Sequence, residues 1–102
     1  MERHGVQLPL DSIREFCRRN KIRKLALFGS ILREDFGPES DVDVLVEYEP
    51  EAHVSYFELF DMEEELAALI GGRKVEMSTP RSLSPYFRDR VISGAEVLYA
   101  GA

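Results

Sequence analysis

Three acidic residues in the middle of the chain have the types and spacing of a metal site. Asp41 and Asp43 stand two positions apart in the β-branched segment 41–47, which predicts a strand with both carboxylates on one face. Two such carboxylates repel each other unless a cation lies between them, and Mg²⁺ prefers carboxylate oxygens. Glu76, in the next predicted strand, adds a third carboxylate if the two strands are neighbours. Three carboxylates around two metal ions form a site for phosphoryl transfer.

Gly29 and Ser30 could hold the phosphate groups on which such a site would act. They follow the apolar run 24–28, which predicts a buried strand, and they open a helical turn. A glycine lets a ligand approach the backbone because it has no Cβ, and the free N–H groups of a helix start suit phosphate oxygens. Alone, a Gly-Ser pair is more typical of an ordinary turn. Arg33 either contacts a phosphate or pairs with Asp35 at the surface.

The elements that must position these residues alternate between helices and strands. The longest helix has Ser55 as its N-cap and glycines as its stop, and Ser84 before Pro85 predicts the start of the last helix. The predicted elements are helix 10–20, strand 24–28, short helix 30–34, strand 41–47, helix 55–70, strand 74–78, helix 84–92 and strand 97–99. This order predicts an α/β (α+β) fold, a small mixed sheet of three to four strands with helices packed on it.

The composition predicts one globular domain over residues 1–102, with residues 1–8 as a loose N-terminus. The chain has 102 residues, of which 44% are hydrophobic, which suits an ordinary core. No apolar run approaches the roughly 18 residues that span a bilayer, and no secretory signal is evident, so we expect no membrane contact. Cys17 is the single cysteine and is expected to be a packing residue; its isolation favours a cytoplasmic location.

Charge is distributed unevenly along the sequence. Residues 34–72 hold thirteen acidic side chains and no Lys or Arg, whereas residues 1–33 hold eight basic and three acidic ones. A long stretch without cations is poorly suited to a phosphate backbone, so we expect no direct binding of nucleic acid. The acidic stretch is either a solvated face or a site for cations or for a basic partner.

The segment 27–46 resembles the signature of the DNA polymerase β-like nucleotidyltransferase superfamily. Its pattern is Gly29-Ser30, ten further residues, and then Asp41 and Asp43 around one intervening position. Within the superfamily the chain resembles the minimal nucleotidyltransferases, the MNT or MntA-type antitoxins that are paired with HEPN toxins. The segments 72–76 and 83–91 continue the resemblance, which covers about residues 10–100.

The resemblance implies the nucleotidyltransferase fold and an enzyme that uses ATP and two Mg²⁺ ions. Such an enzyme transfers AMP to a tyrosine hydroxyl of a partner HEPN ribonuclease and so neutralises it, which implies a hetero-oligomer. The resemblance assigns the triphosphate to Gly29 and Ser30, with Arg33 as a further candidate for the nucleotide, and both metals to Asp41 and Asp43. It makes Glu76 the third metal ligand and the general base.

Three departures from the family pattern keep other functions open. Glu76 stands where Asp is common, and Ile31 and Glu34 stand where relatives often have Arg and Gly. The second hypothesis is therefore an antitoxin with a degenerate site that neutralises its toxin by binding alone. A third is a nucleotidyltransferase for a small molecule, although such enzymes usually add a second domain or a dimer partner to form the acceptor pocket.

Overall fold

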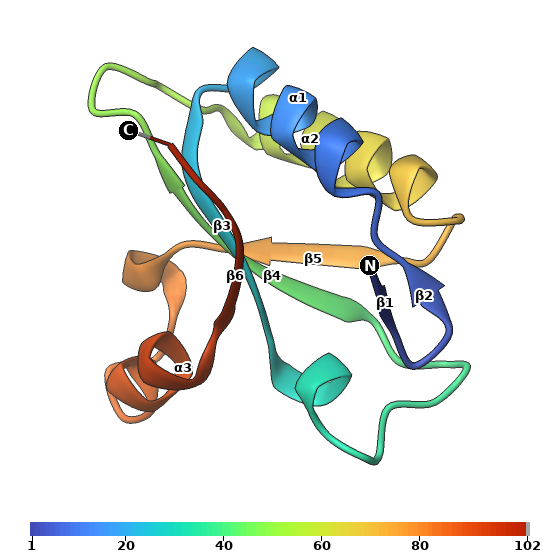
Figure 1. Cartoon of the computed structure of the whole chain (residues 1–102). Helices are drawn as coiled ribbons and strands as arrows, with labels where there is room; N and C mark the ends of the chain where they lie inside the picture. Colours follow the sequence, from blue (N-terminus) through green and yellow to red (C-terminus); the bar gives the residue numbers. More distant parts are fainter. Residues whose placement is uncertain (102) are drawn as a thin grey trace.

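Helices and strands alternate along the chain largely as the residue pattern predicts. The computed structural model describes residues 1–101, and Figure 1 shows the course of the chain. In chain order the elements are β1 (Glu2–Arg3), β2 (Val6–Gln7), α1 (Leu10–Arg19), β3 (Ile22–Phe28), the 3-10 helix η1 (Gly29–Leu32), β4 (Val42–Tyr48), α2 (Tyr56–Leu69), β5 (Val75–Ser78), the 3-10 helix η2 (Pro80–Ser82), α3 (Arg88–Gly94) and β6 (Glu96–Ala100). The short helix predicted at 30–34 is thus the 3-10 helix η1.

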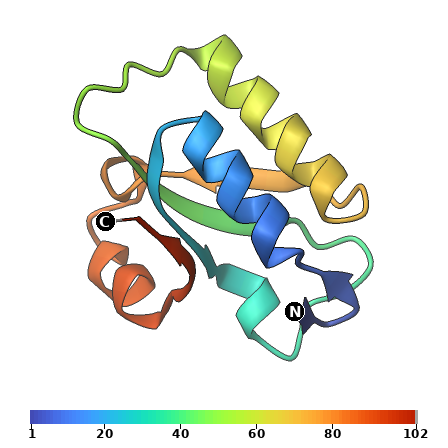
Figure 2. The same cartoon turned by 45° about the horizontal axis from the view of Figure 1, so that its top comes forward.

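A mixed four-stranded sheet forms the centre of the molecule, which confirms the predicted fold class. Its strand order is β5-β4-β3-β6. Strand β3 pairs antiparallel with β4 and β6, whereas β4 and β5 are parallel. Parallel neighbours need a crossover connection, and α2 supplies it. Helices α1 and α2 lie on one side of the sheet, and α3 lies on the other (Figures 1 and 2).

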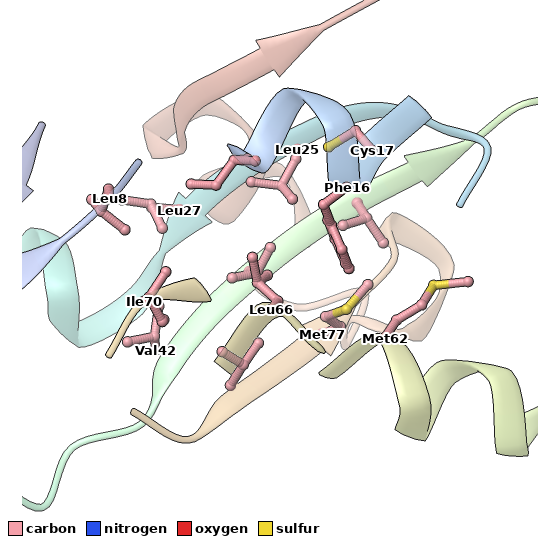
Figure 3. Close-up of a cluster of buried hydrophobic side chains, with 14 of the residues drawn as sticks. Leu8, Phe16, Cys17, Leu25, Leu27, Val42, Met62, Leu66, Ile70 and Met77 are labelled. Atoms are coloured by element: carbon pink, nitrogen blue, oxygen red, sulfur yellow. The ribbon is translucent and has the colours of Figure 1, made fainter. Parts of the chain in front are cut away.

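The main core lies between the sheet and the helices α1 and α2. Val42, Val44 and Val46 occupy alternate positions of β4 and are buried against this helical layer. Phe16 of α1 and Leu66 of α2 pack among them, as the close-up in Figure 3 shows. Because side chains alternate along a strand, the positions between the valines face the opposite side of the sheet. This alternation leaves that side free for polar residues.

Helix α2 begins and ends where the sequence predicts. Ser55 Oγ accepts a hydrogen bond from the backbone N–H of Glu58 at 3.2 Å, and Glu58 Oε1 accepts one from the N–H of Ser55 at 3.3 Å. This reciprocal pair is a capping box, which satisfies N–H groups that the first turn leaves unpaired. At the other end, Gly71 and Gly72 both have positive φ angles, which stop a helix.

Residues 1–8 are ordered, whereas the sequence predicts a loose terminus. Strands β1 and β2 pair as a hairpin, and Val6 and Leu8 are buried in the main core. Arg3 also forms a two-pronged ion pair with Glu96 of β6, with its Nη2 2.5 Å from Oε2. Two separated apolar residues are too few to reveal a strand by periodicity, which explains the difference.

The last helix begins later than the predicted Ser84. Ser84 and the next three residues form a turn, in which Ser84 Oγ accepts from the N–H of Tyr86 and Ser84 O accepts from that of Phe87. Helix α3 starts at Arg88. Serine hydroxyls stabilise turns as well as helix starts, so Ser-Pro alone does not fix the first helical residue.

Within residues 1–101, no helix combines the length and the apolar character that crossing a membrane requires.

Candidate active site

Asp43 and Glu76 lie side by side on the parallel strands β4 and β5, where they are partners in the register. Side chains of register partners point to the same face of a sheet. Val42 and Val75 form the preceding pair and are buried in the core on the other face. Asp43 is partly buried and Glu76 is exposed. The sequence predicts that Glu76 joins the aspartates if their strands are neighbours. The structure meets this condition.

Asp41 stands one residue before β4, and its backbone is held by the neighbouring strand segment. The N–H of Val42 donates to the carbonyl oxygen of Lys74 at 2.8 Å. The Nζ atom of Lys74 lies 3.8 Å from Asp41 Oδ2 and places a cation beside that carboxylate. Among residues 1–101, no three His, Cys, Asp or Glu side chains converge in the geometry of a metal site. The three carboxylates share a face without being gathered around one point.

The charge of Asp43 is disfavoured by its surroundings. Burial raises the pKa of this carboxyl above its ordinary value, and the negative charges of Glu76 and Asp41 raise it further. The guanidinium of Arg33 acts in the opposite direction and lowers that pKa. The three carboxylates therefore interact through space, and a bound cation would relieve their repulsion.

Gly29 is positioned so closely against Asp43 that no other residue fits without displacement. Its φ is +77°, a conformation that favours glycine. A β-carbon at this position would lie 3.2 Å from Asp43 Cγ and closer still to Oδ2. The cause is the antiparallel register, which pairs Phe28, the last residue of β3, with Asp43. The turn after β3 therefore passes directly over the aspartate.

The 3-10 helix η1 is anchored by Ile31, whose side chain is fully buried in the main core. The backbone N–H of Arg33 closes the turn by donating to Ser30 O at 2.9 Å. Ile31 stands where relatives often have Arg, and in this chain its side chain points into the core. Glu34 is exposed.

A cleft of about 380 Å³ opens beside Asp43. Its walls combine one carboxylate, two guanidinium groups, the Gly29 backbone and apolar surface; they are formed by Phe28, Gly29, Leu32, Arg33, Asp43, Arg90, Val91 and Gly94. The structure thus gathers three of the predicted site residues around one space. Ser30, Asp41 and Glu76 do not line it. Arg33 lines the cleft and also pairs with Asp35, with Nε 3.2 Å from Oδ1, so the surface pair weighed from the sequence is present and the phosphate contact stays a prediction.

Arg90 is a cleft residue that the motif does not reveal. It lies on α3, which reaches the cleft from the side of the sheet opposite α2 (Figure 1). Val91 and Gly94, three positions apart on α3, line the same cleft and add to the apolar surface of Phe28 and Leu32. Their spacing shows that they share a helix face, but the sequence alone does not say that this face meets Asp43.

The chain matches the family model "Polymerase beta, Nucleotidyltransferase" over residues 11–101. It belongs to this nucleotidyltransferase family. It is 34% identical over 86 residues to the protein adenylyltransferase MntA of Thermococcus cleftensis. The aligned segment covers 84% of this chain and 82% of that protein. The predicted membership of the nucleotidyltransferases, and of their MntA-type branch, is confirmed.

Solved structures show that this nucleotidyltransferase has the fold of its relatives. A crystal structure of a toxin–antitoxin with AMP-PNP matches with a TM-score of 0.71 and 22% identity, over 91% of this chain and 74% of the other. The structure of a tri-AMPylated HEPN toxin of Shewanella oneidensis in complex with an MNT antitoxin matches with a TM-score of 0.63 and 20% identity. This match covers 89% of this chain and 69% of the other chain. At these identities the likeness concerns the fold.

The loop that leads to Asp41 is held by Arg73 of this nucleotidyltransferase. The Nη2 atom of Arg73 donates to the carbonyl oxygens of Gly37 at 2.9 Å and of Ser40 at 2.6 Å. The guanidinium also lies over the ring of Phe36, 4.7 Å from its centroid. Ser40 Oγ accepts from the N–H of Gly37 at 3.0 Å and so closes the turn before Asp41.

Proposed function

We propose that this chain is an MNT-type antitoxin that transfers AMP from ATP to a tyrosine hydroxyl of a HEPN ribonuclease and thereby neutralises it. The observation that carries the proposal is the register that pairs Asp43 with Glu76 while Gly29 lies against Asp43. Membership of the family and the name of the Thermococcus relative support the reaction type. The HEPN toxin found with an MNT antitoxin in the similar Shewanella structure supports the partner.

Two Mg²⁺ ions would be held by Asp41, Asp43 and Glu76. The donor set fits, because carboxylate oxygens are the ligands that Mg²⁺ prefers and because the other two acids raise the pKa of Asp43. When bound, the metal supplies charge stabilisation for the triphosphate and for the attacking oxygen. The Lys74 ammonium, on an exposed and flexible side chain beside Asp41, can give way to a metal ion.

The chain's own residues would bind the nucleotide and manage the proton. The Gly29 backbone and the Ser30 hydroxyl hold phosphate oxygens, and Arg33 and Arg90, which both line the cleft, neutralise phosphate charge. The tyrosine oxygen forms a bond to the α-phosphorus while the bond from that phosphorus to the β-phosphate oxygen breaks. Pyrophosphate leaves, and the hydroxyl proton passes to the carboxylate of Glu76.

The test is the intact mass of the co-purified HEPN partner after incubation with Mg²⁺ and ATP. We expect a gain of one or more AMP units with the wild-type chain and none with Asp41→Asn/Asp43→Asn. An unchanged mass in a stable complex would favour the non-catalytic antitoxin. AMP on a small acceptor, formed with no protein partner present, would favour the small-molecule enzyme.

A further inference from the structure

Glu63 of α2 is hydrogen-bonded to the strand that carries Glu76. Its Oε2 atom accepts from the backbone N–H of Met77 in β5 at 2.8 Å. Helix α2 covers the main-core face of the sheet, so this contact reaches β5 from the side opposite to the carboxylates of Asp43 and Glu76 (Figures 1 and 2). A hydrogen bond to an ionised acceptor is stronger than one between neutral groups. The contact therefore ties the candidate site to a helix that lies behind it.

The bonded N–H lies on the free edge of β5. This strand spans only Val75–Ser78, and in the sheet formed by residues 1–101 it has β4 on one side and no strand on the other. Backbone groups of successive residues point to alternate sides of a strand. The carbonyl oxygen of Lys74 faces β4, as its bond from the N–H of Val42 shows. Met77, three residues later, therefore faces the outer edge, where Glu63 takes the place of a further strand.

The peptide unit that Glu63 binds is the one that joins Glu76 to Met77. A peptide unit is planar, so a hydrogen bond to its N–H restrains the rotation of the whole plane. This plane is attached to the Cα atom of Glu76 and helps to set the direction in which the Glu76 side chain leaves the strand. Without the bond, the outer edge of β5 is left to water at this point, and the strand is paired on one side only.

The carboxylate of Glu76 has little else to position it. It is exposed, and within residues 1–101 no basic side chain lies within 4.0 Å of it. Asp43, its partner in the register, carries a charge of the same sign and repels it. A glutamate also has one more rotatable bond than an aspartate, so its carboxylate samples a wider space. The backbone of β5 is therefore the fixed point from which this side chain must reach a metal ion or a hydroxyl.

Glu63 makes this hydrogen bond although its charge is unpaired. The side chain is half-buried, and in the described part of the chain no basic group lies within 4.0 Å of it. Burial raises the pKa of the Tyr48 phenol, and the negative charges of Glu63 and Glu58 raise it further. A half-buried carboxylate without a cation costs free energy, so a purely stabilising role would favour a neutral side chain here. What this position supplies is the acceptor oxygen.

We infer that Glu63 is a positioning residue for the candidate active site, because its bond to the Met77 N–H sets the place of Glu76. This inference rests on the proposed role of Glu76 as metal ligand and base, and it adds a residue that lies outside the nucleotidyltransferase motif. Glu63 lies on the core side of the sheet and does not line the cleft beside Asp43. It therefore acts through Glu76 and not on the substrate.

Two substitutions separate the acceptor oxygen of Glu63 from its charge and its bulk. Glu63→Gln keeps an oxygen at the same reach without the charge, and Glu63→Leu keeps a side chain of similar size without an acceptor. Hydrogen exchange of the Met77 amide, followed by NMR, reads the contact directly. We expect wild-type protection in Glu63→Gln and about tenfold faster exchange in Glu63→Leu, as for the loss of one hydrogen bond. The matched control is Glu64→Leu, at the next, exposed position of α2, which should leave the amide protected.

The effect on Glu76 is read first from metal binding, which needs neither ATP nor the HEPN partner. The measurement is the Mg²⁺ concentration that gives a half-maximal rise in melting temperature. Glu63→Leu should need a higher concentration than the wild type, and Glu63→Gln should need the same one. Leu69→Ala, which removes a partly buried side chain from the same helix, should lower the melting temperature without changing this concentration.

The rate of AMP transfer gives a second readout. Glu63→Leu should lower kcat by about 10- to 100-fold, because misplacement of a reacting group by about 1 Å costs about 100-fold. The KM for ATP should stay unchanged, since the substitution does not touch Gly29, Arg33 or Arg90 of the cleft. Glu63→Gln should retain the wild-type kcat, because it retains the acceptor oxygen.

A comparison in the Glu76→Gln background shows whether Glu63 acts through Glu76. If it does, adding Glu63→Leu to Glu76→Gln should leave the Mg²⁺ response as it is in Glu76→Gln alone. A further loss, equal to that in the wild-type background, overturns the inference, because Glu63 then acts on the fold in general. Faster exchange of the Met77 amide in Glu63→Leu with an unchanged Mg²⁺ response and kcat also overturns it, because the bond then only covers the edge of β5.

These outcomes are distinct from those that test the proposed reaction. Absence of AMP from the HEPN partner overturns the proposed reaction, whereas the positioning role then stands if Glu63→Leu alters the Mg²⁺ response and Glu63→Gln does not. AMP transfer by Glu63→Leu at the wild-type rate, with the wild-type Mg²⁺ response, supports the reaction and overturns the positioning role.

Discussion

The backbone of Gly29 lies directly against the carboxylate of Asp43, with no space for a side chain between them. We expect Gly29→Ala to reduce AMP transfer by about 100-fold or more, because a displacement of about 1 Å in a reacting group has that effect. The positive φ adds a destabilisation of about 1–2 kcal/mol. The measurements are the initial rate of transfer to the HEPN partner and the thermal unfolding of the chain.

Gly37→Ala is the matched control for this change. Gly37 has no positive φ, and a β-carbon there meets nothing within 4 Å. It should retain the transfer rate and stability of the wild type. Equal transfer rates for Gly29→Ala and wild type would show that the close approach of Gly29 to Asp43 has no role in the reaction.

Removal of a carboxylate should stabilise the protein in the absence of metal. Burial, Glu76 and Asp41 raise the pKa of Asp43, so its charged form is disfavoured in the folded state. Asp43→Asn should therefore raise the melting temperature at neutral pH without Mg²⁺. Added Mg²⁺ should raise the melting temperature of the wild type and not that of Asp41→Asn/Asp43→Asn, since a ligand stabilises the state that binds it. An equal Mg²⁺ response in both would place the metal elsewhere.

The same raised pKa fixes the sign of the pH dependence. The folded protein binds the Asp43 proton more tightly than the unfolded chain does. The contribution of this group to the free energy of unfolding therefore falls as the pH rises from about 3.8 through the folded-state pKa. Glu76→Gln should lower the pKa of Asp43, because the negative charge of Glu76 raises this pKa more than that of Asp41 does. A carbon-13 NMR titration of the Asp43 carboxyl checks this shift.

The strands and the two candidate site residues Asp41 and Asp43 could be predicted because each is specified locally. Alternation of valines with Asp41 and Asp43 indicates both the strand and its polar face, and the distance from Gly29-Ser30 carries the family pattern. The assignment of Glu76 depended on strand order, which local patterns do not contain. The parallel pairing of β4 and β5 is a consequence of the α2 crossover.

What the sequence did not reveal depends on contacts between distant segments. The N-terminal hairpin is ordered by the burial of Val6 and by the ion pair from Arg3 to Glu96, neither of which has a local signal. Ile31 occupies a position within the motif, yet packing directs it into the core. Arg90 reaches the cleft because β6 brings α3 against the sheet, and a pattern in α3 alone does not show this.

Arg90 should act on the nucleotide more than on the chemical step. It lines the same cleft as Gly29 and Arg33, where the triphosphate is proposed to bind. Arg90→Ala is expected to raise the KM for ATP about tenfold, as for the loss of one hydrogen bond to a charged group. Steady-state kinetics at varied ATP separate KM from kcat. Arg81→Ala, in η2 outside the cleft, is the control, and an unchanged KM for Arg90→Ala would remove Arg90 from the nucleotide site.

Arg73 should position Asp41 through the loop that precedes it. One guanidinium nitrogen binds the carbonyl oxygens of both Gly37 and Ser40, and the Phe36 ring packs beneath the same group. Arg73→Ala leaves both carbonyls without this donor and should lower the free energy of unfolding by about 1–3 kcal/mol. Because the loop leads directly into Asp41, the variant should also need a higher Mg²⁺ concentration for half-maximal transfer.

Arg73→Lys separates positioning by Arg73 from a general loss of stability. Lysine keeps the charge but has no planar guanidinium that can bind the carbonyls and stack on an aromatic ring at the same time. We expect it to recover most of the stability and only part of the Mg²⁺ response. Chemical denaturation gives the first quantity, and transfer rates across a Mg²⁺ titration give the second. If Arg73→Ala lowers stability and leaves the Mg²⁺ dependence unchanged, Arg73 holds the loop without positioning Asp41.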